Sequence, residues 1–311
     1  MIAAMDAGTR TRGTARIRLL VADVDGTLTN SRHEVADATR EAIAVVRAAG
    51  IRVMLATGRR YRDTLPILER LGIDDAPLVT ASGALVKRPA DHATLWRASF
   101  ADGVLEGVLG RIVAAGHEPV VYTDSFHAGH DFHCRTVAGA TPDGGGLAEY
   151  LARNRHLADV RPDLAESPPA GVFAGFAMGS RPAMLALEAE LDEAFPGALS
   201  IHVIRSPRYR DWLCEIAPGG VTKWSGVRAV ADAWGIDARE TCAVGDDVND
   251  LPMIRNAGLG VAMGNAADEV RSAADVVVGT HDGTGIPDVA GLLIAGLAQP
   301  APLGDVEAGG G

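Results

Sequence analysis

Cysteines, aromatic residues and long apolar runs are all scarce in this chain of 311 residues. Its three cysteines, Cys134, Cys214 and Cys242, lie far apart and match no metal-ligand spacing. That pattern argues against a disulfide framework, and it predicts buried thiols in a reducing compartment. Aromatic residues make up only 5%, so we expect aliphatic side chains to fill the core. The apolar stretch at residues 289–298 is about half as long as the ~20 residues of a membrane-spanning helix.

Basic residues are also fewer than acidic ones. The chain carries 29 Lys and Arg against 40 Asp and Glu, a net charge of −11. Such a surface repels phosphate backbones, so we expect no nucleic-acid partner, and any phosphate site must be made attractive locally. The N-terminus lacks the pattern of a signal peptide, which predicts a cytoplasmic protein with no membrane partner. Residues 1–14 and 299–311 are polar, aperiodic and Gly-rich, and we predict disordered tails there.

Short apolar runs alternate with helical patterns in the first and last thirds of the chain. Strands are predicted at 17–24, 51–56, 77–80, 241–244, 259–263 and 276–278. Helices are predicted at 36–48, in a stretch that follows residue 59 and ends at 71, and at 222–234 and 250–257. This alternation predicts an α/β fold, a doubly wound, mainly parallel Rossmann-like sheet with right-handed crossovers. Residues 84–199 break the pattern with mixed segments and Gly- or Pro-rich interruptions. We therefore predict a discontinuous core, 15–83 and 200–298, with an inserted α+β cap domain at 84–199.

Carboxylates follow the predicted strands of the core. Asp23 and Asp25 come after the first strand, and Asp246 and Asp250 come after the strand at 241–244. Because the carboxyl ends of parallel strands share one edge of a sheet, these groups should meet there. Massed carboxylates repel one another, and a hard cation relieves that repulsion. Oxygen ligands favour Mg²⁺, so we predict Mg²⁺ as the cofactor, held in part by Asp246 and Asp250.

The same residues can carry phosphoryl transfer. An ionised Asp23 can attack phosphorus to form an aspartyl-phosphate, and Asp25 can protonate the leaving oxygen and later deprotonate water. Phosphate contacts are predicted for a hydroxyl, a loop glycine, an ammonium group and an amide: Thr57, Gly58, Lys223 and Asn249. In the alternative interpretation without catalysis, the aspartates are turn or helix-capping residues, and Lys223 is a solvated helix residue.

Four segments together resemble the motifs of the haloacid dehalogenase-like superfamily. They are Asp23-Val24-Asp25-Gly26-Thr27-Leu28-Thr29, Ala56-Thr57-Gly58-Arg59, Lys223, and Gly245-Asp246-Asp247-Val248-Asn249-Asp250. Residues 260–266 and Ala274-Asp275 resemble the Cof-type phosphatase branch, whose members carry a large cap between the second and third motifs. The resemblance implies that the side chain of Asp23 and the backbone carbonyl of Asp25 join the metal ligands. It covers roughly residues 17–83 and 200–292.

Two positions depart from the family pattern or extend it. Ser82 stands where the branch usually has asparagine, which leaves that substrate contact in doubt. Asp247 occupies a variable position of the fourth motif, and its role as a ligand, a supporting group or a solvated side chain is open, although we expect that it is not a metal ligand. Possible substrate contacts are a set of polar residues near the predicted cap: Arg59, Ser82, Tyr122, Asp124, His127 and Arg205. His127 and His130 also suggest a second metal site as an alternative, although their spacing matches no established metal-binding motif.

The sequence therefore predicts a Mg²⁺-dependent phosphomonoester hydrolase that acts on a small phosphorylated metabolite, such as a sugar phosphate, through Asp23. A phosphomutase or phosphotransferase with the same intermediate remains open. A non-catalytic phosphate-binding module is a further alternative, against which Asp25 argues because such a module needs no leaving-group acid. Dehalogenation shares the superfamily but needs no metal. The substrate and the oligomeric state are not specified by the sequence.

Overall fold

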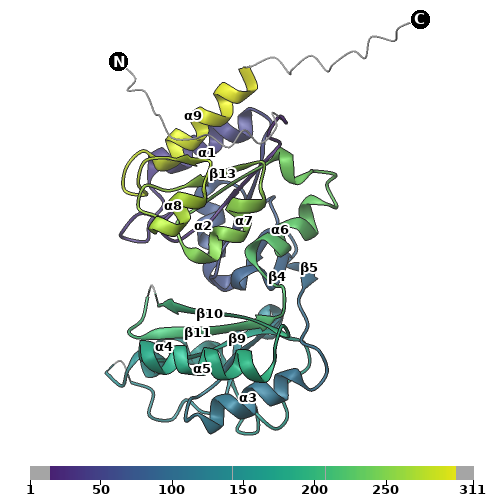
Figure 1. The fold of residues 1–311 in the computed structure, drawn as a ribbon, viewed down its shortest axis with the longest axis vertical. Helices are drawn as coiled ribbons and strands as arrows, with labels where there is room; N and C mark the ends of the chain where they lie inside the picture. Colours follow the sequence, from purple (N-terminus) through teal and green to yellow (C-terminus); the bar gives the residue numbers. More distant parts are fainter. Residues whose placement is uncertain (1–14, 142, 207, 299–311) are drawn as a thin grey trace, which may run out of the picture. The chain divides into compact units, whose positions relative to one another are not determined.

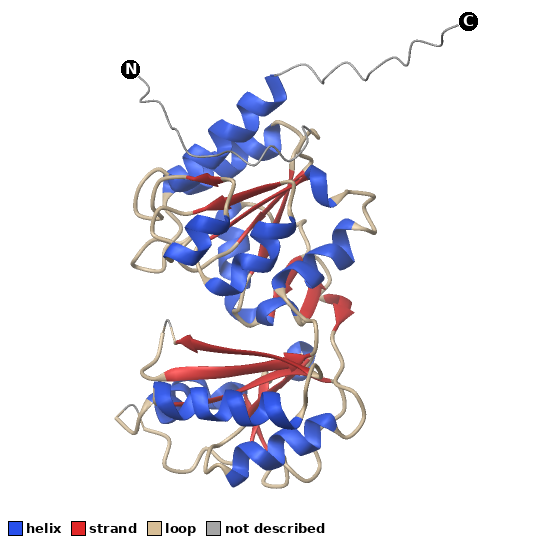
Figure 2. Cartoon of the chain, in the orientation of Figure 1, coloured by secondary structure: helices blue, strands red, loops and turns tan. Residues whose placement is uncertain are grey.

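The computed structural model describes residues 15–141, 143–206 and 208–298. The predicted tails at 1–14 and 299–311 lie outside these residues. The described chain forms two compact units, one of residues 15–56, 66–76 and 228–298 and the other of residues 57–65 and 77–227. These bounds differ from the core and cap that we predicted, and that division stays a prediction. Figure 2 shows helices and strands mixed in both units, which confirms the α/β class.

A parallel sheet forms the centre of the first unit. Its strands, in spatial order, are β14 (Val276–Val277), β13 (Leu259–Ala262), β12 (Thr241–Gly245), β1 (Leu19–Ala22) and β2 (Arg52–Ala56). Every neighbouring pair is parallel, with Ala22 opposite Val244 on one side and Leu55 on the other. The residues of β1 and β12 are buried without alternation, as in a sheet covered on both faces.

Helices cover both faces of this sheet. α1 (Asp37–Ala48) packs against α9 (Gly285–Ala298), while α7 (Leu251–Asn256) and α8 (Asp268–Ala273) lie on the other face (Figure 1). The apolar stretch at 289–298 belongs to α9, the helix that packs against α1. No helix of the described residues combines the length and apolarity that crossing a membrane requires.

Two further elements lie at the boundaries of the units. α2 (Tyr61–Leu71) follows β2, and α6 (Lys223–Ala231) precedes β12 in the chain. In the second unit, β3 (Leu78–Thr80), β4 (Leu85–Arg88) and β5 (Ala93–Arg97) pair antiparallel in sequence order. The short turn between β3 and β4 places Ser82 at a φ of 53°, in the left-handed region.

A six-stranded sheet forms the rest of the second unit. Its order is β10 (Leu199–Arg205), β11 (Trp212–Pro218), β9 (Val172–Gly179), β6 (Val120–Thr123), β7 (Phe132–Cys134) and β8 (Ala158–Val160). The pairs are antiparallel except β7 with β8, which is parallel.

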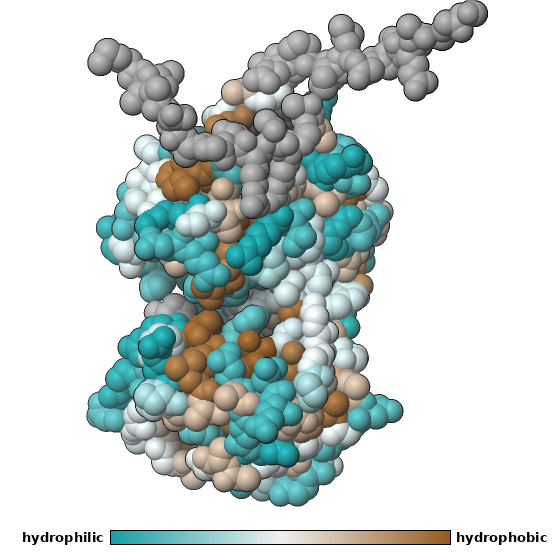
Figure 3. Space-filling model, viewed as in Figure 1, coloured by the Kyte–Doolittle hydropathy of each residue, from teal (hydrophilic) through white to brown (hydrophobic). Residues whose placement is uncertain are grey.

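The helices of the second unit pack on this sheet through two hydrophobic clusters. α3 (Val104–Ala114) and α5 (Arg181–Ala194) share a cluster with Val121, whereas α4 (Gly146–Asn154) packs through Tyr150 beside Val120. Since successive side chains of a strand point to opposite faces, the two neighbouring valines separate the clusters. The exposed large hydrophobic side chains belong to several elements. Scattered exposure of this kind is normal for a surface. The face drawn in Figure 3 is mostly hydrophilic or intermediate, with apolar residues gathered on parts of it.

Candidate active site

Asp23 lies at the carboxyl end of β1, at the start of a tight loop. Its amide donates to the carbonyl of Val244 (3.0 Å), and its side chain is only 4% exposed. The loop turns because the Val24 carbonyl accepts from the amides of Leu28 (3.0 Å) and Thr29 (2.9 Å), and from the Thr29 hydroxyl (3.0 Å). The bond from the Asp23 amide to Val244 holds Asp23 beside β12.

Gly26 is required in this loop for two reasons. Its φ of +75° lies in the left-handed region, which side chains disfavour. A Cβ at this position would also stand 2.2 Å from Oδ2 of Asp246. The missing side chain therefore lets the carboxylate of Asp246 approach the backbone that follows Asp23.

The second loop of the site follows β12 and is organised by Asp250. This carboxylate is fully buried and accepts from the amides of Asp246 (2.9 Å) and Asp247 (3.1 Å). A Cβ on Gly245 would stand 2.4 Å from the Asp250 carboxyl, so a glycine is needed there as well. Asp250 makes no side-chain cap bond to α7, but its bond to the Asp247 amide completes a capping box on the short helix at residues 248–250. A capping role for Asp250 is therefore present and is compatible with a metal-ligand role.

Asp247 and Asn249 take different positions in this loop. Asp247 is exposed, and its carboxylate caps the short helix η5 (Val248–Asp250) by accepting from the Val248 amide (2.7 Å). The side-chain oxygen of Asn249 is buried and has no hydrogen-bond partner within the described part of the chain. A buried polar atom of this kind favours an additional group beside the loop.

Asp23, Asp246 and Asp250 come together as a cluster of carboxylates. One oxygen from each lies within 4.8 Å of the others. Three carboxylates at this separation repel one another in a buried setting, and a hard divalent cation with oxygen ligands would relieve that repulsion. The donor set and its burial therefore fit a metal ion.

Two side chains that sequence reasoning had not placed hold Asp246 in the cluster. The hydroxyl of Thr27 donates to Oδ1 of Asp246 (2.9 Å). The amide of Asn265 donates to the Gly26 carbonyl (2.9 Å) and lies 3.4 Å from Oδ2 of Asp246, while its oxygen accepts from His281 (2.9 Å). Asn265 thus connects the loops that carry Gly26, Asp246 and His281. The role of Thr27 could have been predicted from its place in the Asp-x-Asp-Gly-Thr motif.

His33 is a neighbour of Asp25 that the sequence did not indicate. Its Nδ1 lies 3.5 Å from Oδ1 of Asp25, and both side chains are partly exposed. The residue has a φ of 61°, an unusual backbone conformation for a non-glycine residue. An imidazole at this distance can bias the charge of Asp25.

Thr57, Gly58 and Lys223 belong to the second unit, so their meeting with the aspartates of the first stays a prediction. Thr57 is 1% exposed, its amide donates to Val79 (3.0 Å), and its hydroxyl oxygen accepts from the amide of Arg59 (3.1 Å). Lys223 is 2% exposed and begins α6. Its burial does not fit the interpretation of a solvated first-turn lysine.

A concavity of about 450 Å³, including space open to solvent, lies on the sheet of the second unit. The hydroxyl of Ser82 donates to Glu215 (3.2 Å) within it. Three residues that line it were predicted as phosphate or substrate contacts: Gly58, Ser82 and Tyr122. The other polar residues of its lining are Ser200 and His202 of β10 and Glu215 of β11.

The remaining predicted substrate residues have other surroundings. Asp124 pairs with the buried ammonium group of Lys87, which also contacts Thr94 (3.2 Å). His127 is exposed and packs edge-on against the Phe126 ring. Arg205 is exposed and donates to the carbonyl of Asp211 (3.0 Å). These contacts give each residue a structural partner, and a substrate role for any of them stays a prediction.

All three cysteines are buried and free of disulfides, as predicted. Burial raises the pKa of Cys134 to about 11 and the pKa values of Cys214 and Cys242 to about 12. A thiol with such a pKa is protonated at neutral pH and is a poor nucleophile.

The match to known proteins agrees with this geometry. Residues 20–289 match the model of the haloacid dehalogenase-like hydrolases. The chain belongs to this family. The four motifs had predicted this membership, and it is confirmed. As a member of this family, the chain is a hydrolase. The carboxylate cluster is formed by residues of the first and the fourth family motif.

Several relatives are similar over nearly their whole length. A phosphatase of Bacillus subtilis, YwpJ, is 27% identical, with 87% of this chain and 97% of the relative covered. The 5-amino-6-(5-phospho-D-ribitylamino)uracil phosphatase YcsE of the same organism is 24% identical, covering 87% and 93%. A haloacid dehalogenase-like hydrolase structure from Bacteroides thetaiotaomicron superposes with a TM-score of 0.73 at 24% identity, covering 90% and 99%. This last similarity supports the fold.

Proposed function

We propose that this hydrolase is a Mg²⁺-dependent phosphatase that cleaves a small phosphorylated metabolite through an aspartyl-phosphate on Asp23. The observation that carries the proposal is the convergence of Asp23, Asp246 and Asp250 within 4.8 Å at the carboxyl ends of β1 and β12. Relatives with phosphatase names, matched over almost their whole length, support the same reaction class.

The metal would be held by the carboxylates of Asp23, Asp246 and Asp250, joined by the backbone carbonyl of Asp25. A bound Mg²⁺ would neutralise charge on these carboxylates and on the phosphate oxygens. An all-oxygen donor set favours Mg²⁺ over softer transition metals. The Asp246 side chain is already oriented by Thr27 (2.9 Å), so little reorganisation would be needed on binding.

The chain's own residues supply the reaction steps. An oxygen of the Asp23 carboxylate forms a bond to phosphorus as the bond from phosphorus to the leaving oxygen breaks. Asp25 gives its proton to that oxygen, then removes a proton from the water that hydrolyses the aspartyl-phosphate.

Phosphate contacts are proposed for Thr57, Gly58, Lys223 and Asn249. Thr57 follows directly after β2, whose Leu55 is opposite Ala22, the residue before Asp23. Because the Thr57 oxygen already accepts from Arg59, its hydroxyl proton can be donated to a phosphate oxygen. The concavity of the second unit, lined in part by Gly58, Ser82 and Glu215, carries hydroxyl, imidazole and carboxylate groups that would suit a polyhydroxylated ligand such as a sugar or polyol.

Replacing Asp23 tests the proposal. We expect Asp23→Asn to lower the turnover of p-nitrophenyl phosphate by at least about 10³-fold, as when a covalent nucleophile is removed, while circular dichroism is unchanged. Asp247→Asn, in an exposed neighbouring carboxylate, is the matched control and should retain activity. Equal activity in Asp23→Asn and the native chain would overturn the mechanism.

The competing functions give different results in the same assays. A phosphomutase would convert a hexose phosphate to its isomer with little release of phosphate. A dehalogenase would keep its activity in the presence of a chelator. A pure phosphate-binding module would show no turnover of any phosphorylated metabolite with or without Mg²⁺.

A further inference from the structure

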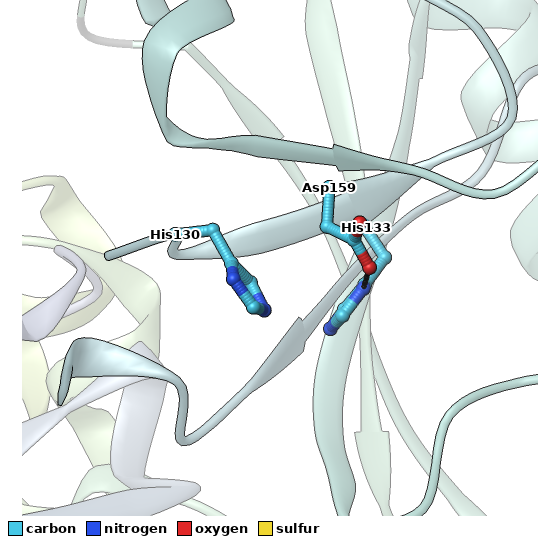
Figure 4. Close-up of side chains that lie close together, drawn as sticks. All are labelled: His130, His133 and Asp159. Atoms are coloured by element: carbon cyan, nitrogen blue, oxygen red, sulfur yellow. Dashed lines mark hydrogen bonds and ion pairs between the residues drawn. The ribbon is translucent and has the colours of Figure 1, made fainter. Parts of the chain in front are cut away.

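Three potential metal-binding side chains of the second unit lie together at one edge of its six-stranded sheet (Figure 4). His133 on β7 and Asp159 on β8 are directly paired in the parallel register of the two strands. His130, two residues before β7, lies with its ring against that of His133, with the centroids 5.0 Å apart. One donor atom from each residue lies within 4.8 Å of the other two.

Hydrogen bonds hold these side chains and their backbone in place. The hydroxyl of Ser125 donates to the His130 carbonyl (2.9 Å), and the next amide, of Asp131, donates to the carbonyl of Leu157 (2.9 Å). The loop that carries His130 is therefore tied on one side to β6 and on the other to the start of β8. His133 is 3% exposed and makes hydrogen bonds with both ring nitrogens.

We propose that His130, His133 and Asp159 bind one Zn²⁺ ion in a tetrahedral site completed by water. Two imidazoles and one carboxylate suit Zn²⁺ and other borderline transition metals, whereas Mg²⁺ prefers oxygen ligands. Bonds of about 2.0–2.2 Å place neighbouring tetrahedral donors roughly 3.3–3.6 Å apart. The three donor atoms lie within 4.8 Å of one another, so they would have to approach by about 1 Å to share one ion.

The hydrogen bonds of His133 suit a ligand histidine. Its Nε2 lies 2.8 Å from the Thr123 hydroxyl, and a partner of this kind orients a ring whose other nitrogen binds a metal. Its Nδ1 lies 2.9 Å from Oδ2 of Asp159, and in the proposed site both atoms would bind the ion in place of each other.

The position of the site indicates a structural role. β8 has three residues and is the outermost strand, and its pairing with β7 is parallel whereas the other neighbours in this sheet are antiparallel. An ion bound to both strands and to the His130 loop would hold this short edge strand in register. The proposal is independent of the chemistry at Asp23, which lies in the other unit.

Metal titration of the full chain tests this site. The protein is stripped with a chelator, excess Mg²⁺ is added to fill an oxygen-ligand site, and Zn²⁺ is titrated by calorimetry with the bound metal counted by mass spectrometry. We expect one Zn²⁺ per chain and a rise in the melting temperature. His130→Ala and Asp159→Asn, at partly exposed positions, should weaken Zn²⁺ binding by more than about 100-fold, since losing even an outer partner costs about 10- to 100-fold.

The matched control is His127→Ala, an exposed histidine of the same loop outside the cluster. It should bind Zn²⁺ as tightly as the native chain and show the same thermal shift. Native protein that takes up no Zn²⁺ in excess Mg²⁺ would overturn the proposal. Equal Zn²⁺ binding by the native chain, His130→Ala and Asp159→Asn would overturn it as well, because the ion would then lie elsewhere.

Discussion

The hydroxyl of Thr27 offers a sharp test of how the proposed metal site is organised. Thr27 is 1% exposed, and its Oγ1 donates to Oδ1 of Asp246 at 2.9 Å. Thr27→Val keeps the shape of the side chain and removes only this hydrogen bond. Without it, the Asp246 carboxylate can rotate away from Asp23 and Asp250, so the ion should bind more weakly.

The expected size of the effect follows from the type of bond. A hydrogen bond to a charged group contributes about 1.5–3 kcal/mol. Loss of a partner that orients a metal ligand typically weakens metal binding by about 10- to 100-fold, which corresponds to about 1.4–2.8 kcal/mol. We therefore expect the Mg²⁺ concentration for half-maximal phosphate release to rise by about 10- to 100-fold. The rate at saturating Mg²⁺ should change much less, because Thr27 contacts no reacting atom in the proposed mechanism.

A second buried threonine in the same loop provides the control. Thr29 is fully buried, and its hydroxyl donates to the Val24 carbonyl at 3.0 Å, away from the carboxylates. Thr29→Val should cost about 0.5–1.5 kcal/mol of unfolding free energy and leave the Mg²⁺ midpoint unchanged. Thr27→Ser, which retains the hydroxyl, should restore most of the Mg²⁺ affinity. If Thr27→Val and Thr29→Val shift the midpoint equally, the orienting role of Thr27 is wrong.

Three other changes are predicted from burial and charge. Asp124→Ala should cost about 3–5 kcal/mol in urea denaturation because it leaves Lys87, only 2% exposed, without its carboxylate; a loss below about 1 kcal/mol would contradict this. Burial lowers the pKa of His202 below 6.5, so the unfolded state binds the extra proton and stability falls as the pH drops from 6.5 toward the native pKa. His202→Gln should therefore reduce the difference in unfolding free energy between about pH 7.5 and about pH 5.5, and an unchanged difference would refute the assignment. The buried thiols should resist alkylation in the native protein and react once it is denatured, as judged by mass spectrometry; they are Cys134, Cys214 and Cys242.

The positions of the three clustered carboxylates were predictable because they depend on strand ends. The apolar run at 17–24 contains β1, and the run at 241–244 lies within β12. Parallel pairing brings the carboxyl ends of these two strands to one edge. Asp23 and Asp246 had to meet once that pairing was known. The predicted helix at 36–48 also agrees with α1 to within one residue.

Side-chain orientations within the loops could not be predicted in the same way. The buried Asp250 accepts from two amides of its own loop, an arrangement that depends on backbone angles and on the absence of a Cβ at Gly245. His33 approaches Asp25 through a positive φ that no residue pattern indicates. Such contacts follow from local geometry, which periodicity does not specify.

The His130, His133 and Asp159 cluster escaped prediction for a different reason. The histidine spacing matched no metal motif, and the third residue lies 26 positions beyond His133. β7 and β8 have three residues each, which is too short for an alternating pattern to be recognised. Their parallel register is set by the intervening α4, so the cluster becomes visible only in three dimensions.

The bond between Thr27 and Asp246 joins residues separated by 219 positions. During synthesis at about 5–20 residues per second, the second partner emerges roughly 10–45 s after the first. Until then the Asp23 amide lacks its hydrogen-bond acceptor, because the Val244 carbonyl of β12 has not yet been synthesised. A nascent chain thus carries Asp23, the proposed nucleophile, for most of translation before the loop of Asp246 and Asp250 exists, and we expect activity to appear only after β12 has joined the sheet.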